Sequence, residues 1–271
     1  MMTDHRYRRM RLWRCAICVL ALIAAVPASA QQSTPPQTAT DVAMALVLAV
    51  DASGSVSNAR FELQKQGYAA AFRSPQVLNA IRSLATQSIA VTMMQWTGPA
   101  LHVVVVDWTL IKDEATASGF ADAIAAAPRQ LFGGGTSISG AIDYSRLLLT
   151  LGPFKGARRV IDISGDGANN RGRPVTAARD EAVADGIGIN GLPILALEPD
   201  LDRYYYDNVI GGPGAFMIPA ANYDTFADAI LKKLITEMAG TAGGAITSNT
   251  VDSNRPTVSQ TRPSLRRDFP G

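Results

Sequence analysis

Two aspartates stand at positions where predicted strands end, and hydroxyl side chains accompany them. Asp51 follows a long apolar run and is followed at two-residue spacing by Ser53 and Ser55, whereas Asp166 follows a second apolar run. Carboxylate and hydroxyl oxygens are the ligands that hard divalent cations such as Mg²⁺ prefer. The pattern predicts a divalent metal site if the fold brings the two loops together.

A third loop supplies another hydroxyl group. Thr136 follows the three glycines 133–135 and precedes a predicted helix. Two carboxylates balance the charge of a divalent cation, and so few strong ligands leave a coordination position open. We therefore expect a cation held by Asp51, Ser53, Ser55, Thr136 and Asp166 and completed from outside. Gly54 is expected to allow the tight turn between the serines, because it has no Cβ to clash.

Each motif also has a local explanation. An Asp-x-Ser-x-Ser pattern arises often by chance, an aspartate after a strand can cap the next helix, and glycine-rich loops are frequent connectors. The three motifs together, each at the end of a regular element, are far more specific than any one of them.

The elements between these loops alternate in type. Short apolar segments predict strands at 42–50, Ile89–Trp96, 101–107, 159–164 and 188–197. Helical spacing of apolar residues predicts helices at Asn58–Arg73, 114–127, 137–151, 175–185 and 222–239. This alternation indicates an α/β fold with a mostly parallel central sheet and helices on both faces. The short Gly98-Pro99 turn joins two strands as a hairpin, so one edge strand is expected to be antiparallel.

The motif set resembles a known site. Asp51-x-Ser53-x-Ser55, Thr136 after glycines and Asp166-Gly167 are similar to the metal-ion-dependent adhesion site of von Willebrand factor A (vWA) domains. The resemblance covers residues 41–240, and segments 48–51, 160–167, 189–194 and 209–216 also resemble a bacterial family of unknown function, DUF1194. It implies a Rossmann-like fold, bound Mg²⁺ (or Mn²⁺/Ca²⁺), and metal-mediated binding to another protein that offers an acidic residue. It implies no enzymatic activity.

The two ends of the chain differ from this domain. Residues 1–30 combine arginines, an apolar run and a final Ala-Ser-Ala, which predicts a secretory signal peptide cleaved after Ala30. The run 16–26 is too short for a membrane span, so we expect a periplasmic or secreted protein without a span after cleavage. Export by the general or the twin-arginine route stays open. Residues 31–40 are predicted to be a linker, and the polar segment 241–271 a disordered tail.

Charge and cysteine content exclude several classes of site. Cleavage would remove five arginines and one aspartate, leaving 20 basic and 22 acidic residues and a net charge of −2. No basic patch then argues for nucleic acid. Both cysteines, Cys15 and Cys18, lie in the signal segment, so thiolate metal sites and cysteine nucleophiles are excluded in the mature chain.

Two other functions compete with the binding module. A metal-dependent hydrolase or phosphotransferase could use an aspartate at a strand end, but such enzymes usually carry a second aspartate at the position of Ser53 and a nearby lysine. The other alternative is a structural domain whose metal site is not used.

Several residues have two interpretations at this stage. Asp162 could support the metal site or form a salt bridge, and residues 169–171 could contact a partner or form a solvated turn. The tyrosines 204–206 could belong to an interface or to the core. The glycine-rich segment 211–214 is interpreted as a structural loop, and His102 as a packed or exposed histidine rather than a catalyst.

Overall fold

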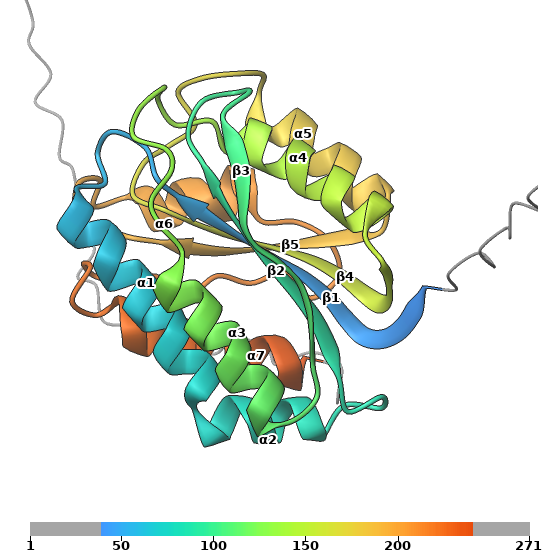
Figure 1. The fold of residues 1–271 in the computed structure, drawn as a ribbon. Helices are drawn as coiled ribbons and strands as arrows, with labels where there is room; N and C mark the ends of the chain where they lie inside the picture. Colours follow the sequence, from blue (N-terminus) through green and yellow to red (C-terminus); the bar gives the residue numbers. More distant parts are fainter. Residues whose placement is uncertain (1–38, 241–271) are drawn as a thin grey trace, which may run out of the picture. The chain divides into compact units, whose positions relative to one another are not determined.

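The computed structural model describes residues 39–240. The predicted signal peptide (1–30) and tail (241–271) lie outside this range, and so does the predicted linker apart from residues 39 and 40. A five-stranded sheet runs through the middle of the domain in the order β3-β2-β1-β4-β5 (Figure 1). β3 pairs with β2 antiparallel and all other pairs are parallel, as predicted from the hairpin. The strands are β1 (Thr40–Asp51), β2 (Ile89–Trp96), β3 (His102–Ile111), β4 (Phe154–Gly165) and β5 (Ile187–Pro193).

Helices cover both faces of this sheet. Figure 1 shows α1, α3 and α7 on one side and α4 and α5 on the other. Each side has its own buried apolar cluster, so the sheet separates two cores. The helices are α1 (Asn58–Arg73), α2 (Pro75–Arg82), α3 (Glu114–Ala126), α4 (Ile138–Leu151), α5 (Val175–Ala184), α6 (Leu201–Tyr204), the π-helix η1 (Tyr205–Val209) and α7 (Phe226–Ala239).

The central position of β1 follows from its sequence. Side chains alternate along a strand, and here both sets are apolar: Met44 and Leu46 pack in the core under α1 and α7, while Ala45 and Val47 pack in the core under α4 and α5. A strand that is buried on both faces in this way is typical of a parallel sheet covered by helices. Asp51 ends this strand, at the edge where the carboxyl ends of the parallel strands meet.

The structure differs from the predicted elements in several places. α2 was not predicted; it begins directly after α1, with Ser74 as N-cap and Pro75 in the first turn, where proline is tolerated. β4 begins at Phe154 rather than at 159, and β3 continues to Ile111 rather than ending at 107. α7 begins at Phe226 rather than at 222, because the preceding residues form a turn around the side chain of Asn222.

A further difference concerns the end of β5. The predicted strand ran to residue 197, but β5 ends at Pro193. Pro193 pairs with Gly165, the last residue of β4, so the following residues have no strand to pair with on that side. Two other boundaries are close to their predictions: Thr40, placed in the predicted linker, is the first residue of β1, and Ser137 is the N-cap of α4 rather than its first residue. Among residues 39–240 no helix is long and apolar enough to cross a membrane.

Candidate metal centre

Asp51 is the most deeply buried of the predicted ligands. Its side chain is 0% exposed, and its Oδ1 accepts a hydrogen bond of 2.7 Å from the backbone N–H of Ser53. The backbone carbonyl of Asp51 accepts a hydrogen bond from the side chain of Gln64 in α1, at 3.2 Å. The carboxylate therefore lies at the base of the loop that carries the two serines. One hydrogen bond holds the carboxylate and another holds the backbone carbonyl of Asp51.

Ser53, Ser55 and Asp166 are joined in a chain of short polar contacts. The hydroxyl oxygens of Ser53 and Ser55 are 3.1 Å apart, and the Ser55 hydroxyl donates to Oδ1 of Asp166 at 2.6 Å. The loop after β1 and the loop after β4 thus meet through their side chains, because β1 and β4 are parallel neighbours that end at the same edge of the sheet. Four of the five predicted ligands are gathered here.

Thr136 is held nearby by its backbone. Its N–H donates to Oδ1 of Asn170 at 2.9 Å, and its carbonyl accepts from the N–H groups of Asn170 and Arg171. Its hydroxyl faces the loop after β4, since a Cβ added at Gly167 would lie 3.7 Å from Oγ1 of Thr136. The structure therefore brings all five predicted residues to one edge of the sheet.

The second oxygen of Asp166 is occupied by a residue that the sequence did not indicate. The hydroxyl of Tyr223 donates to Oδ2 of Asp166 at 2.8 Å. Arg60 lies beside both: its Nη1 is 3.9 Å from the same oxygen and donates to the carbonyl of Ser55 at 3.0 Å, and its guanidinium lies 5.2 Å from the centre of the Tyr223 ring. Burial, together with the charge of Asp166, raises the pKa of Tyr223, so the phenol stays a donor.

One carboxylate oxygen has no partner. Oδ2 of Asp51 is buried and accepts no hydrogen bond within the described residues. It lies close to the loop after β4, since a Cβ added at Gly165 would meet both this oxygen and the hydroxyl of Tyr205 at 3.0 Å. Burial, augmented by the negative charge of Asp166, raises the pKa of Asp51 to about 7 despite the hydrogen bond from Ser53. This environment disfavours an uncompensated carboxylate and would be relieved by a cation.

Arg129 connects the loops that carry the ligands. Its Nη2 donates to the carbonyls of Ala52 and Ser53, at 3.0 and 3.1 Å, and its Nε donates to Leu131 in its own loop at 2.9 Å. Phe132 packs on its guanidinium at 4.8 Å. Gln64, Arg129 and Tyr223 were missed by the sequence analysis, because their roles depend on contacts with residues far away in the chain.

The residues with two interpretations are assigned by their contacts. Asp162 forms a buried ion pair with Lys233, which supports the salt-bridge interpretation. Asn169 and Asn170 hold the backbone of Ser139 and Thr136 rather than forming only a solvated turn.

The tyrosines 204–206 are divided between the core and the surface. Tyr205 is buried in the core, whereas Tyr206 is 67% exposed. His102 stacks on Tyr144 with ring centres 4.3 Å apart, as a packed histidine. The loop 211–214 is structural, since Gly211 forms a bridge with Ile189 of β5.

The expectation for Gly54 was wrong. A Cβ added there would have no neighbour within 4 Å, and the residue does not have a positive φ. The turn between the serines therefore does not require glycine. In the loop before Thr136, by contrast, Gly134 and Gly135 have positive φ values of 103° and 83°, which favour glycine.

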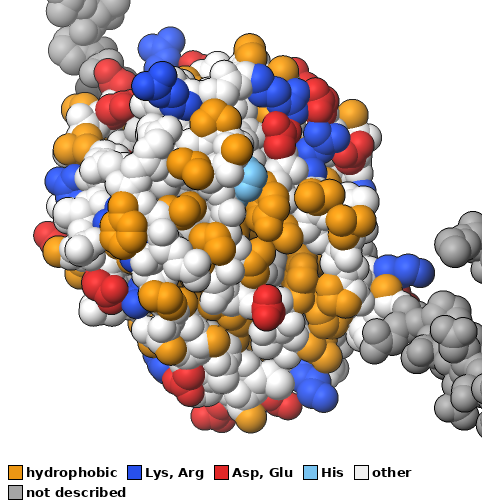
Figure 2. Space-filling model, turned by 45° about the horizontal axis from the view of Figure 1, so that its top comes forward, with side chains coloured by type: hydrophobic (Ala, Val, Ile, Leu, Met, Phe, Trp, Pro, Cys, Tyr) orange, Lys and Arg blue, Asp and Glu red, His pale blue; other side chains and the backbone are white. Residues whose placement is uncertain are grey.

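The charges on the face shown in Figure 2 are mixed. On the face shown in Figure 2, acidic and basic side chains lie mostly at the periphery and alternate in sign, with hydrophobic and uncharged side chains between them. Residues 39–240 contain no group of three or more His, Cys, Asp or Glu side chains that could hold a metal ion. Any cation at this centre would therefore depend on hydroxyl oxygens in addition to the two carboxylates.

The fold is that of known vWA domains. Similar solved structures include proximal thread matrix protein 1 from the mussel byssus (TM-score 0.52, 15% identity, 74% of this chain and 49% of that one) and a von Willebrand factor type A protein from Catenulispora acidiphila (0.53, 15%, 73% and 43%). The vWF domain of the pilus tip protein Mfa5 from Porphyromonas gingivalis is also similar (0.54, 11%, 76% and 98%). The chain spans less than half the length of the first two proteins.

Two further comparisons concern the metal and the family. A structure of the mussel protein in which zinc occupies the metal-ion-dependent adhesion site (MIDAS) motif also matches. Its TM-score is 0.51 at 15% identity, over 72% of this chain and 46% of that one. No curated protein matches this sequence. Residues 41–242 match the model of a family described as "Protein of unknown function (DUF1194)". The chain therefore belongs to the DUF1194 family and has the fold of a vWA domain.

Proposed function

We propose that this protein is an exported binding module that uses a divalent cation to hold an acidic residue of another protein. Asp51, Ser53, Ser55, Thr136 and Asp166 would bind the cation. Mg²⁺ suits this set of two carboxylates and three hydroxyls best, and Mn²⁺ or Ca²⁺ offers the same preference for oxygen.

The observation that carries the proposal is the unpartnered oxygen of Asp51. Oδ2 of this side chain is buried without a hydrogen bond, beside a second carboxylate on the same edge of the sheet. Buried polar atoms in proteins are nearly always satisfied, and an unsatisfied one calls for an explanation such as an ion. A cation at this point would satisfy the oxygen and offset the repulsion between Asp51 and Asp166.

The position of the site supports completion by a partner. Asp51 lies at the bottom, whereas Ser55 and the neighbouring Gly54 are exposed at the surface. A cation held between them would be reachable from outside, and a carboxylate is the strongest oxygen ligand that a partner protein can supply. The proteins with this fold include a thread matrix protein of the mussel byssus and a pilus tip protein, which agrees with export of this chain after removal of residues 1–30.

Calorimetric titration with Mg²⁺ and Mn²⁺ tests the cation site. We expect saturable binding by the natural protein and a loss of affinity of about tenfold or more in Asp51→Asn, which keeps the size of the side chain but removes its charge. Asp107→Asn is the matched control, because Asp107 is an exposed residue of β3. Equal binding by the natural protein and Asp51→Asn would refute the assignment.

Affinity capture from the envelope fraction tests the partner. Proteins retained in Mg²⁺ but released by a chelator, and lost with Thr136→Ala, are the expected partners. Proteins retained equally under all conditions would show that binding does not run through the cation.

A further inference from the structure

A second cluster of charged side chains lies inside the domain, on the side of the sheet covered by α7. Lys233 and Glu237 come from α7 and Asp162 from β4, and all three side chains are 0% exposed. The Nζ of Lys233 is 2.8 Å from Oδ1 of Asp162 and 3.6 Å from Oε2 of Glu237. An amine, a carboxyl group and a second carboxylate are therefore in contact in a place without access to solvent.

The contact between Lys233 and Asp162 lacks the geometry of a hydrogen bond. Although the two atoms are close, neither Nζ of Lys233 nor either carboxylate oxygen of Asp162 has a hydrogen-bond partner among residues 39–240. The ring of Phe216 covers the amine, 5.2 Å from Nζ. Buried charges are stabilised only when they are both paired and hydrogen-bonded, so this pair is poorly stabilised as two ions.

Glu237, in contrast, is firmly held. Its two oxygens accept hydrogen bonds from Nδ2 of Asn190, at 2.9 and 2.7 Å, and Oε1 also accepts from Nη2 of Arg158 at 3.1 Å. The carboxylate is thus fixed beside the amine and already has its own cationic partner. It is placed to receive and return a proton.

We propose that Lys233 and Asp162 are joined by an intramolecular amide bond. In this reaction the Lys233 ammonium group gives a proton to Glu237, which passes it to the carboxylate of Asp162, and the freed lone pair of Nζ attacks Cγ of the neutral carboxyl group. The C–N bond forms, the C–O bond breaks, and the departing hydroxyl takes up a second proton from the nitrogen and leaves as water. An ammonium and a carboxylate become an amide and one water, and Glu237 returns to its starting state.

The surroundings favour this reaction in two ways. The reacting groups are held at the close approach that makes intramolecular reactions fast. Burial also raises the pKa of Asp162, against the opposing effect of Lys233, and so favours the neutral carboxyl group that an amine can attack. After the bond has formed, two buried charges have disappeared and the pair of Arg158 and Glu237 remains balanced.

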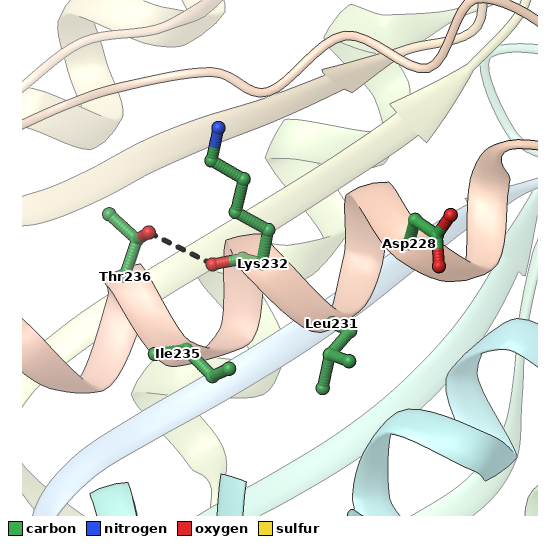
Figure 3. Close-up of a pocket in the computed structure, with 5 residues that line it drawn as sticks. All are labelled: Asp228, Leu231, Lys232, Ile235 and Thr236. Atoms are coloured by element: carbon green, nitrogen blue, oxygen red, sulfur yellow. Dashed lines mark hydrogen bonds between the residues drawn. The ribbon is translucent and has the colours of Figure 1, made fainter. Parts of the chain in front are cut away.

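The bond would fasten α7 to the central sheet. Both cysteines of the chain lie before residue 39, so no disulfide can do this within residues 39–240. The neighbouring Lys232 provides an internal comparison. It lies on the outer side of α7, where it lines a shallow depression with Asp228, Leu231, Ile235 and Thr236 (Figure 3).

The mass of the intact denatured protein tests the proposal. We expect the chain to be one water lighter than its sequence requires, once its amino terminus has been identified. A tryptic digest should yield a branched peptide that joins the segments of Lys233 and Asp162, without cleavage after Lys233. A mass equal to that of the sequence would show that the contact is an ion pair, and the loss of ammonia instead of water would place the bond at Asn190; either result overturns the proposal.

Three variants test which side chains the loss of water requires. Lys233→Met and Glu237→Gln should have their full sequence masses, since they lack the nucleophile and the proton acceptor. Lys232→Met should remain one water lighter than its own sequence. A Glu237→Gln protein that still loses water would overturn the role of Glu237. The mass of the natural protein decides the main question even if the variants at buried positions do not fold.

Discussion

The hydroxyl of Ser55 lies 2.6 Å from Oδ1 of Asp166, although 111 residues separate them in the chain. This hydrogen bond joins the loop after β1 to the loop after β4. It places the hydroxyl oxygen of Ser55 between the hydroxyl of Ser53 and the carboxylate of Asp166, with its hydrogen turned toward Asp166. The lone pairs of Ser55 are thereby left available to a cation.

Ser55→Ala should weaken cation binding without unfolding the domain. The variant loses one oxygen ligand and the donor that orients Asp166, so we expect the Mg²⁺ affinity to fall by about tenfold, or roughly 1.4 kcal/mol. Calorimetric titration measures this change.

Ser57→Ala is the control for this variant. Ser57 caps α1 through Arg60 N–H, so its replacement should cost about 1 kcal/mol of stability and leave the cation affinity unchanged. If the two variants lost affinity equally, the effect would come from the loop and not from the ligand.

Gly165→Ala should disturb the site sterically. The added Cβ would lie 3.0 Å from Oδ2 of Asp51 and 3.0 Å from the hydroxyl of Tyr205, which is closer than most real contacts. We expect a loss of about 1–2 kcal/mol of stability and weaker Mg²⁺ binding. Gly54→Ala, where the added atom meets nothing within 4 Å, should change the stability by less than about 0.5 kcal/mol. Urea unfolding compares the two, and equal effects would contradict the geometry.

Arg129→Ala should destabilise the loop after β1 and the loop that carries Arg129 itself. The variant loses the hydrogen bonds to Ala52, Ser53 and Leu131, and we expect a loss of about 2–3 kcal/mol of stability because bonds from a charged donor are among the stronger ones. Arg129→Lys keeps the charge but has a single nitrogen in place of the separate Nε and Nη2 that reach Leu131 and the loop after β1, so it should restore little of this stability. Full restoration by lysine would mean that only the charge of Arg129 matters.

The stability of the metal-free protein should fall as the pH rises toward neutrality. The pKa of Asp51 is raised from 3.8 to about 7 in the folded state. The folded form therefore holds its proton more tightly than the unfolded form, and this contribution is fully present below pH 3.8 and is lost as the pH rises through about 7. The shift corresponds to about 4 kcal/mol at most.

Urea unfolding at pH 5 and pH 8 checks this dependence. Asp51→Asn, which has no proton to lose, should show a smaller drop in stability between these pH values than the natural protein. Addition of Mg²⁺ should stabilise the natural protein more at pH 8 than at pH 5, because the cation competes with the proton for Asp51. If the drop in stability between pH 5 and pH 8 were the same in Asp51→Asn and in the natural protein, groups other than Asp51 would cause the pH dependence.

Much of this protein could be predicted from its sequence. The alternation of apolar strands and amphipathic helices led to the parallel sheet with helices on both faces, and the Gly98-Pro99 turn led to the antiparallel edge strand. The positions of Asp51, Ser53, Ser55, Thr136 and Asp166 at the ends of predicted elements led to the expectation that these side chains gather beyond the strand ends. These features are local, since they depend on periodicity, on turn residues and on which residue follows a strand.

The tertiary structure alone decided which groups complete and support the site. The phenol of Tyr223 reaches Asp166 and the guanidinium of Arg129 reaches the loop after β1 only because α7 and the loop before Thr136 pack beside them. The same holds for Lys233. A lysine in a helix is usually exposed, but this one lies against Asp162 inside the domain. Such pairs join residues tens of positions apart, and their energies depend on burial and distance. Neither quantity exists until the chain has folded.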